Sequence, residues 1–139
     1  MNRLIAVLIG FLAISSAFAD ENDFRCFKSV GLKKPVRLQF VFQAEKEGVG
    51  YVRYETGTGP IQVKRLKERE LRRVANGRPS EFETTWLELV PKGAGGTYLV
   101  VSQGALIDDF RYIRPDGKTF RFEEDLEAST EEGCRWSAR

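Results

Sequence analysis

Apolar and polar residues alternate in short stretches along most of this chain. In the clearest stretch, residues 36–43, every second side chain is apolar: Val36, Leu38, Phe40 and Phe42. A period of two is typical of a strand that buries one of its faces. We therefore predict a half-buried strand at 36–43, followed by a hairpin partner at 49–55 that carries Tyr51, Val52 and Tyr54.

Further strands are predicted at 61–66, 82–90, 97–103 and 106–114 from their β-branched and aromatic residues. The sequence Arg114-Pro115-Asp116-Gly117 is typical of a type I turn followed by a left-handed glycine. Such a turn would pair the residues before it with those after it. We expect Phe110 and Tyr112 to lie opposite Phe120 and Phe122.

Residues 67–75 are harder to assign. They are strong helix formers, and Glu68 stands four residues before Arg72. Asn76-Gly77 and Pro79 would end a helix there, but Asn-Gly is also the favoured two-residue hairpin turn. We favour a short charged helix or irregular excursion over 67–75, with a hairpin as the alternative.

Six to eight short strands joined by hairpin turns predict an all-β fold. The expected architecture is a small antiparallel meander, closed into a barrel or folded into a sandwich, with one short helix at most. Residues 20–139 have the length of one domain.

Residues 1–19 have the pattern of a secretory signal peptide. Arg3 precedes an apolar run at 4–14, and Ala17-Phe18-Ala19 forms a small-residue cleavage sequence. The run is short for a bilayer span, no second one follows, and no cysteine stands at the cleavage point. We predict a mature protein that is periplasmic or secreted and not membrane-anchored.

The two cysteines, Cys26 and Cys134, lie near the two ends of the mature chain. The compartment permits disulfides, so we predict a bond between them that joins the chain ends. Two buried free thiols are the alternative.

Charge is unevenly distributed along the chain. The 22 Lys and Arg residues include Arg3, so loss of the leader leaves them nearly balanced against 20 Asp and Glu. A basic segment covers 64–78, and an acidic run lies near the C-terminus: Glu123, Glu124, Asp125, Glu127, Glu131 and Glu132. Each is either a solvated face or a surface that steers a charged partner. The basic segment lacks interleaved aromatic residues, so we expect no nucleic-acid partner.

Candidate catalytic groups are few. The sequence contains no histidine, which removes the commonest general base and the usual zinc ligands. Asp108 and Asp109 are adjacent, so on a strand they share one site only if a bulge intervenes. Asp116 and the acids at 123–125 do not follow a calcium-binding loop, and the glycines at 57 and 59 lack a phosphate-loop ending. We expect a protein that is not an enzyme and holds no cofactor or metal.

The stretch from Tyr98 to Gly104 resembles the Tyr-x-x-x-Ser-Lys-Gly hairpin of the bacterial C-type lysozyme inhibitors, with Gln103 in place of the lysine. Phe24-Arg25-Cys26, Tyr112 and Cys134 agree with that family in order, whereas its Ser-Gly-x-x-Tyr motif is missing, its positions falling on Leu89, Val90 and Gly93. The resemblance implies a small exported β-barrel that plugs a lysozyme active site. On this resemblance, the expected binding loop consists of Tyr98, Ser102, Gln103 and Gly104.

These observations lead to a hypothesis of a non-catalytic exported binding protein whose partner is another protein, in the most concrete case a lysozyme-like cell-wall hydrolase. Lysozymes are typically basic, so the acidic run would assist encounter. One alternative is a carrier of a small apolar ligand lined by aromatic residues: Phe40, Phe42, Tyr51, Tyr54, Trp86, Phe120 and Phe122. Another is a structural or assembly subunit of the cell envelope.

Overall fold

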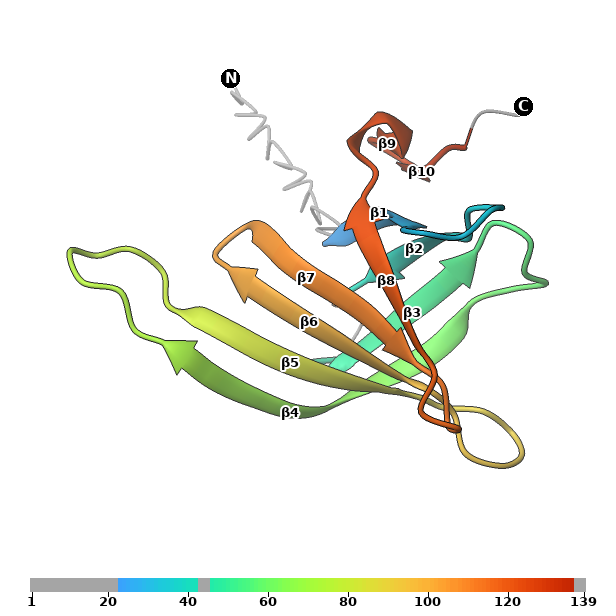
Figure 1. The fold of residues 1–139 in the computed structure, drawn as a ribbon, viewed down its shortest axis with the longest axis horizontal. Coiled ribbons are helices and arrows are strands. Elements are labelled where there is room, and N and C mark those ends of the chain that lie inside the picture. The colour runs from blue at the N-terminus through green and yellow to red at the C-terminus, as the bar shows by residue number, and fades with distance from the viewer. Residues whose placement is uncertain (1–22, 43–45, 137–139) are drawn as a thin grey trace, which may run out of the picture.

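The computed structural model describes residues 23–42 and 46–136, and the predicted signal peptide lies outside them. Eight antiparallel strands form a closed barrel in which each strand pairs with its neighbours in sequence and the last pairs with the first (Figure 1). The strands are β1 Phe24–Ser29, β2 Arg37–Val41, β3 Val49–Tyr54, β4 Ile61–Arg72, β5 Glu81–Glu88, β6 Thr97–Gln103, β7 Leu106–Ile113 and β8 Thr119–Glu124. The all-β prediction is confirmed, as a barrel and not a sandwich.

Beyond β8 the chain forms a short clasp against the outer face of β1 and β2, where the Cys134 amide donates to Gln39 Oε1 at 2.9 Å. It consists of the 3-10 helix η1 (Leu126–Ala128) and the two-stranded hairpin of β9 (Ser129–Thr130) and β10 (Gly133–Cys134). The predicted disulfide is confirmed: Cys26 on β1 is bonded to Cys134 on β10, 108 residues later. The Asp125 amide donates to the Cys26 carbonyl at 2.7 Å, so backbone bonding supports the same junction.

The favoured prediction for residues 67–75 is wrong, because β4 continues through this segment to Arg72. Cross-strand partners decide the outcome: Lys67 pairs with Thr85, and Arg69 lies opposite Glu83 with 2.9 Å between Arg69 Nη2 and Glu83 Oε1. The ladder of cross-strand pairs with β5 outweighs a helix propensity of a few tenths of a kcal/mol per residue. The hairpin alternative is right.

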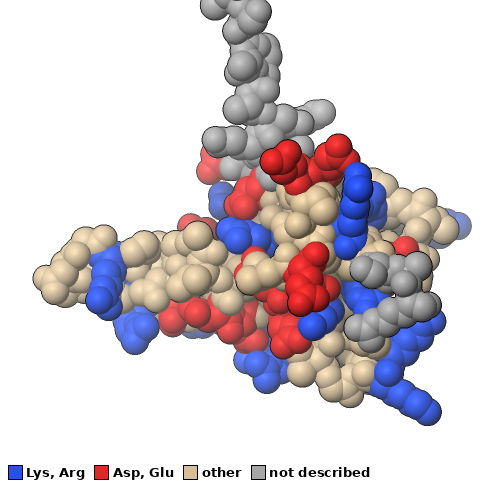
Figure 2. Space-filling model, turned by 90° about the horizontal axis from the view of Figure 1, so that it is seen from above, with Lys and Arg blue, Asp and Glu red and all other residues tan. Residues whose placement is uncertain are grey.

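The outer part of the β4–β5 hairpin, residues 67–83, extends away from the barrel, and we call it the arm (Figures 1 and 2). β3 pairs with β4 over Ile61–Lys64, and the Arg65 amide donates to the Gly48 carbonyl at 2.8 Å; beyond Arg65, β4 pairs with β5 alone. At the tip, Asn76 and Gly77 have φ values of 67° and 71°, the left-handed backbone typical of an Asn-Gly turn, but the last β4–β5 pair is Arg72 with Glu81, so the connection covers residues 73–80 and is not a two-residue turn.

Aromatic side chains fill the middle of the barrel. Phe27 and Phe110 stack with 4.0 Å between ring centroids, and the Phe40 ring meets Phe110 edge to face at 5.5 Å. Residues that are essentially inaccessible to solvent surround them: Leu38, Val52, Val63 and Tyr98. Tyr51 lies on the opposite face of β3 from buried Val52, so it does not line the interior as the carrier hypothesis expected. The filled core separates two pockets at opposite ends of the barrel.

Within the described ranges, no helix is long and apolar enough to cross a membrane.

Candidate functional site

A cleft opens at the barrel end where β5 begins and β6 ends, and we call it the polar cleft. Its volume is about 240 Å³. Charged and small polar side chains share its wall with aromatic and aliphatic ones: Asp23, Arg25, Phe42, Arg65, Glu68, Thr84, Trp86, Val100, Ser102, Gly104 and Ile107. Both arginines are paired, since Arg25 Nη1 lies 3.2 Å from Glu124 and Arg65 Nη1 lies 3.6 Å from Glu68. The cleft therefore presents hydrogen-bonding groups of both signs.

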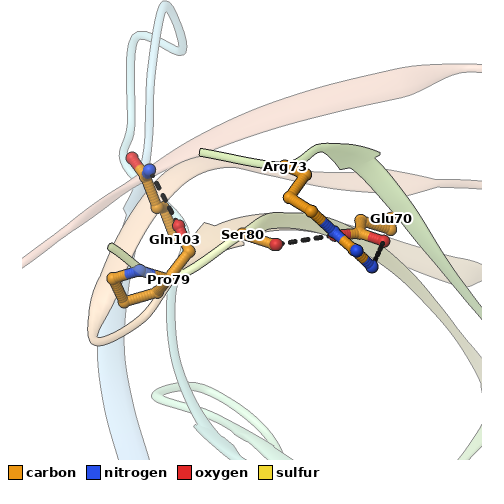
Figure 3. A network of polar contacts seen from close by, with 5 residues as sticks. All are labelled: Glu70, Arg73, Pro79, Ser80 and Gln103. Carbon is orange, nitrogen blue, oxygen red and sulfur yellow. Dashed lines mark hydrogen bonds and ion pairs between the residues drawn. The ribbon is translucent and has the colours of Figure 1, made fainter. Parts of the chain in front are cut away.

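The predicted loop residues Ser102, Gln103 and Gly104 lie together at the lip of this cleft. Ser102 lines it, whereas Gln103 turns outward and donates from Nε2 to the Pro79 carbonyl at 3.0 Å (Figure 3). Gly104 has a φ of 58°, and a Cβ there would lie 3.1 Å from Pro79 Cγ. The β6–β7 turn is thus held against the segment that returns from the tip of the arm to β5.

A second set of contacts fixes the arm near that point. Glu70 accepts a 2.6 Å hydrogen bond from the Ser80 hydroxyl and a 3.2 Å bond from Arg73 Nε (Figure 3). These bonds, the one from Ser80 first, lower the pKa of the Glu70 carboxyl from its ordinary value. The connection between β4 and β5 is therefore tied back to β4 beside the Gln103 contact.

Tyr98, the fourth predicted loop residue, lies elsewhere. It is in the middle of the barrel with no exposed surface, and its hydroxyl donates to Glu88 Oε1 at 2.6 Å. Tyr98, Val100 and Ser102 all point inward from β6, at every second position. Tyr98 is four residues before Ser102, so it lies deeper along the strand than the lip of the cleft. Tyr98 supports the barrel and does not reach its surface.

The acidic run follows β8 into the clasp, and half of its members form ion pairs. Glu123 lies 3.4 Å from Lys28, Glu124 pairs with Arg25, and Glu132 lies 2.8 Å from Arg135. Glu127 and Glu131 are exposed, and Asp125 is half-buried at the start of η1. In the described part of the chain, no group of three or more acidic or thiol ligands could hold a metal ion.

The adjacent acids of β7, Asp108 and Asp109, lie at a β-bulge. Val101 pairs with Asp109 and Ser102 with Ile107, which leaves Asp108 as the extra residue. Asp109 lies 2.6 Å from Arg111 and 3.8 Å from Arg121. The bulge does not unite the two carboxylates, because Asp109 is occupied by arginines and Asp108 is exposed.

A second pocket, which we call the apolar pocket, opens at the opposite end, where β5 ends and β6 begins. Its volume is about 390 Å³. Mostly apolar side chains line it, together with one carboxylate and one guanidinium: Leu32, Val36, Tyr54, Ile61, Glu88, Tyr112, Arg114, Phe120 and Phe122. Three residues expected to line a carrier site, Tyr54, Phe120 and Phe122, are found here.

Glu88 is the polar centre of the apolar pocket. Its carboxylate accepts from the Tyr98 hydroxyl at 2.6 Å, the Gly96 amide at 3.1 Å and the Tyr112 hydroxyl at 3.3 Å. The Tyr54 and Tyr98 oxygens are 2.6 Å apart. Burial, ahead of the nearby Glu88 charge, raises the pKa of Tyr112, and burial is also the largest cause of the raised pKa of Tyr54 and Tyr98. The three phenols keep their protons at neutral pH.

Sequence reasoning did not single out Glu88. A signal was present, because Glu88 follows Thr84 and Trp86 at every second position of β5 and so belongs to the inward face. A carboxylate in a row of core positions indicates a buried polar site.

The barrel, the disulfide and the two end pockets define the class of structure to which this chain belongs, a small disulfide-linked antiparallel β-barrel. No family model, no curated protein and no solved structure matches the chain.

Proposed function

We propose that this protein is an exported, non-catalytic binding protein that recognises another protein through the polar end of its barrel. The observation that carries the proposal is the anchored β6–β7 turn: Gln103 and Gly104 rest on Pro79 while Ser102 faces the polar cleft. A turn held in this way loses little conformational freedom when a partner binds, and that loss is a main cost of association.

The most concrete partner is a lysozyme-like cell-wall hydrolase. The enzymes of this class act with a pair of carboxyl groups. Ser102 offers a hydroxyl, and Gln103 retains a second amide hydrogen beyond the one given to Pro79. Both groups donate hydrogen bonds to carboxylates without any chemical step.

Two further observations support this proposal. The closed barrel with an early and a late cysteine joined is the fold that the resemblance to C-type lysozyme inhibitors implies. Residues 1–19 and the disulfide both fit an oxidising compartment outside the cytoplasm, where a cell-wall hydrolase would be met.

The test is the rate at which a c-type lysozyme clears a bacterial cell-wall suspension with purified residues 20–139 in molar excess. We expect slower clearing, and we expect Ser102→Glu to restore the rate because it places a negative charge against the catalytic carboxylates. Thr119→Glu is the matched control, since Thr119 is exposed at the other end of the barrel. Unchanged clearing with the wild-type protein would reject lysozyme as the partner, and equal effects of both substitutions would reject the role of the turn.

A carrier with a central cavity is not favoured, because aromatic side chains fill the middle of the barrel. The apolar pocket is a separate site at one end of the barrel.

A further inference from the structure

We propose that the apolar pocket binds a small organic cation, an amine with an apolar body, whose charged head is directed at Glu88. This site lies at the opposite end of the barrel from the anchored turn, and it does not depend on the proposed recognition of a hydrolase.

The first argument is the charge of Glu88. The residue is only 8% exposed, yet no Lys or Arg of the described residues lies within ion-pair distance of its carboxylate. Buried carboxylates are ordinarily paired with a cation or a metal. Its three hydrogen bonds come from neutral donors, which leaves one of about four acceptor positions open. A cation supplied from outside would complete the pair.

The second argument is the direction of the hydrogen bonds around Glu88. Tyr98 gives its single hydroxyl hydrogen to Glu88, so the 2.6 Å bond between Tyr54 and Tyr98 must be donated by Tyr54. Tyr112 likewise gives its hydrogen to Glu88. Tyr54 and Tyr112 both line the pocket, and with their hydrogens given away their phenol oxygens can act only as acceptors there. A floor made of acceptors alone fits a head group that only donates, as an ammonium does.

The third argument is that the polar groups around Glu88 are preorganised. Tyr112 reaches Glu88 across Gly96, where a Cβ would lie 2.3 Å from the tyrosine ring. At Gly95, a Cβ would lie 2.3 Å from the Glu88 carbonyl oxygen. The loop before β6 thus depends on two adjacent glycines to bring Tyr112 and the Gly96 amide onto the carboxylate.

The walls determine the rest of the ligand. A volume of about 390 Å³ falls within the range of small-molecule sites, and Leu32, Val36 and Phe120 supply an apolar surface for a ring or short alkyl chain. The one cation in the wall, Arg114, is already compensated by Asp116 at 3.0 Å. An anionic amphiphile would have to place its apolar tail against Glu88, so the charge distribution favours a cationic ligand.

The experiment uses three probes of nearly equal shape: 2-phenylethylammonium, neutral 2-phenylethanol and anionic phenylacetate. Each is titrated at neutral pH into isotopically labelled residues 20–139, and binding is followed by NMR shift changes. We expect saturable binding of the ammonium probe, with the largest shifts at residues of the apolar pocket. We expect binding weaker by roughly tenfold or more for the other two, as loss of a charged hydrogen bond implies.

Two variants separate the pocket from general charge effects. Glu88→Gln should lower the affinity for the ammonium probe by roughly tenfold or more. Glu83→Gln should leave that affinity unchanged, because Glu83 lies on the outer face of the same strand, where it pairs with Arg69. Should Glu88→Gln not fold, Leu32→Trp serves instead, because Leu32 is partly exposed at the rim and a larger ring there would fill the pocket. Ser102→Glu should bind the probe like the wild type, which keeps this test independent of the lysozyme assay.

Several results would overturn the proposal. These are equal binding of the alcohol, tighter binding of phenylacetate, no saturable binding of the ammonium probe, or full affinity in both Glu88→Gln and Leu32→Trp. A capped lysine that binds more tightly than 2-phenylethylammonium would also overturn it, since the occupant would then be a side chain of a protein partner.

Discussion

The Tyr98 hydroxyl donates a 2.6 Å hydrogen bond to Glu88 in the interior of the barrel, where neither residue has more than 8% of its surface exposed. The two residues lie on adjacent strands, β6 and β5, one on each side of the turn that carries Gly95 and Gly96. The bond joins the aromatic core to the apolar pocket.

Tyr98→Phe should lower the free energy of unfolding by about 1–3 kcal/mol, because it leaves a buried carboxylate oxygen and the Tyr54 hydroxyl without a partner. Tyr51→Phe, on the outer face of β3, is the control and should change stability by less than about 0.5 kcal/mol. Urea denaturation followed by tryptophan fluorescence measures both. Equal midpoints for the two variants would show that the Tyr98–Glu88 bond adds nothing to stability.

Stability should fall at alkaline pH. Burial raises the pKa of Tyr54 and Tyr98 above the ordinary value of 10.0, so in the folded protein they keep protons that the unfolded chain has lost. Unfolding above pH 10 then releases protons, and the free energy of unfolding decreases by about 1.4 kcal/mol per pH unit for each such tyrosine. The contribution is fully present below pH 10. Urea midpoints at pH 8, 10 and 11 should show the decline, with a shallower slope for Tyr54→Phe; an identical slope in that variant would contradict the assignment.

Gly50→Ala should destabilise the barrel by about 1–3 kcal/mol, since the added Cβ would lie 2.3 Å from the Val41 carbonyl oxygen, with Val63 also close at 3.2 Å. Gly59→Ala is the matched control, because a Cβ there meets nothing within 4 Å. Its stability should stay the same or rise slightly as the unfolded chain becomes stiffer. Thermal melts by far-UV circular dichroism compare the two. A melting temperature of Gly50→Ala equal to or above that of Gly59→Ala would show that the backbone around Gly50 can make room for the added Cβ without loss of stability.

The Cys26→Ala, Cys134→Ala double variant should melt several degrees lower and keep a β-type spectrum. The disulfide closes a loop across 108 residues. Its loss increases the conformational entropy of the unfolded chain and so lowers the free energy of unfolding by about 2–4 kcal/mol, while the strand pairing persists. Mass spectrometry after alkylation of the unreduced protein checks the premise. Two alkylatable thiols there would contradict the bond itself.

The parts of the fold that were predicted correctly depend on local chemistry. Alternation placed Leu38 and Phe40 on the inner face of β2, and both are fully buried. In the turn at 114–117, the Gly117 amide donates to the Arg114 carbonyl at 2.9 Å, Gly117 has a φ of 89°, and the flanking aromatic residues pair as expected, Tyr112 with Phe120. In each case residues within a few positions of one another carry the information.

The parts that were missed depend on contacts between strands that no local motif marks. β4 contains a favourable helical spacing between Glu68 and Arg72, but Arg72 instead lies 3.7 Å from Glu81, across the hairpin. Tyr98 matched a loop motif by sequence, although its hydroxyl is bonded to Glu88 on another strand. The polar cleft and the apolar pocket each draw residues from most of the strands, so no single segment could have revealed them.

Closure of the barrel through β1 and β8 has a consequence for how the chain acquires its fold. Phe27 pairs with Glu124, so the first strand to be synthesised waits for the last before its outer edge is covered. Contacts of such high sequence separation form slowly, and until they form the edges of β1 and β8 are open to pairing with other chains. Oxidation of Cys26 and Cys134 fixes that same junction once it has formed. For the export proposed above this order would be favourable, because the disulfide can form only after both Cys26 and Cys134 have crossed the membrane.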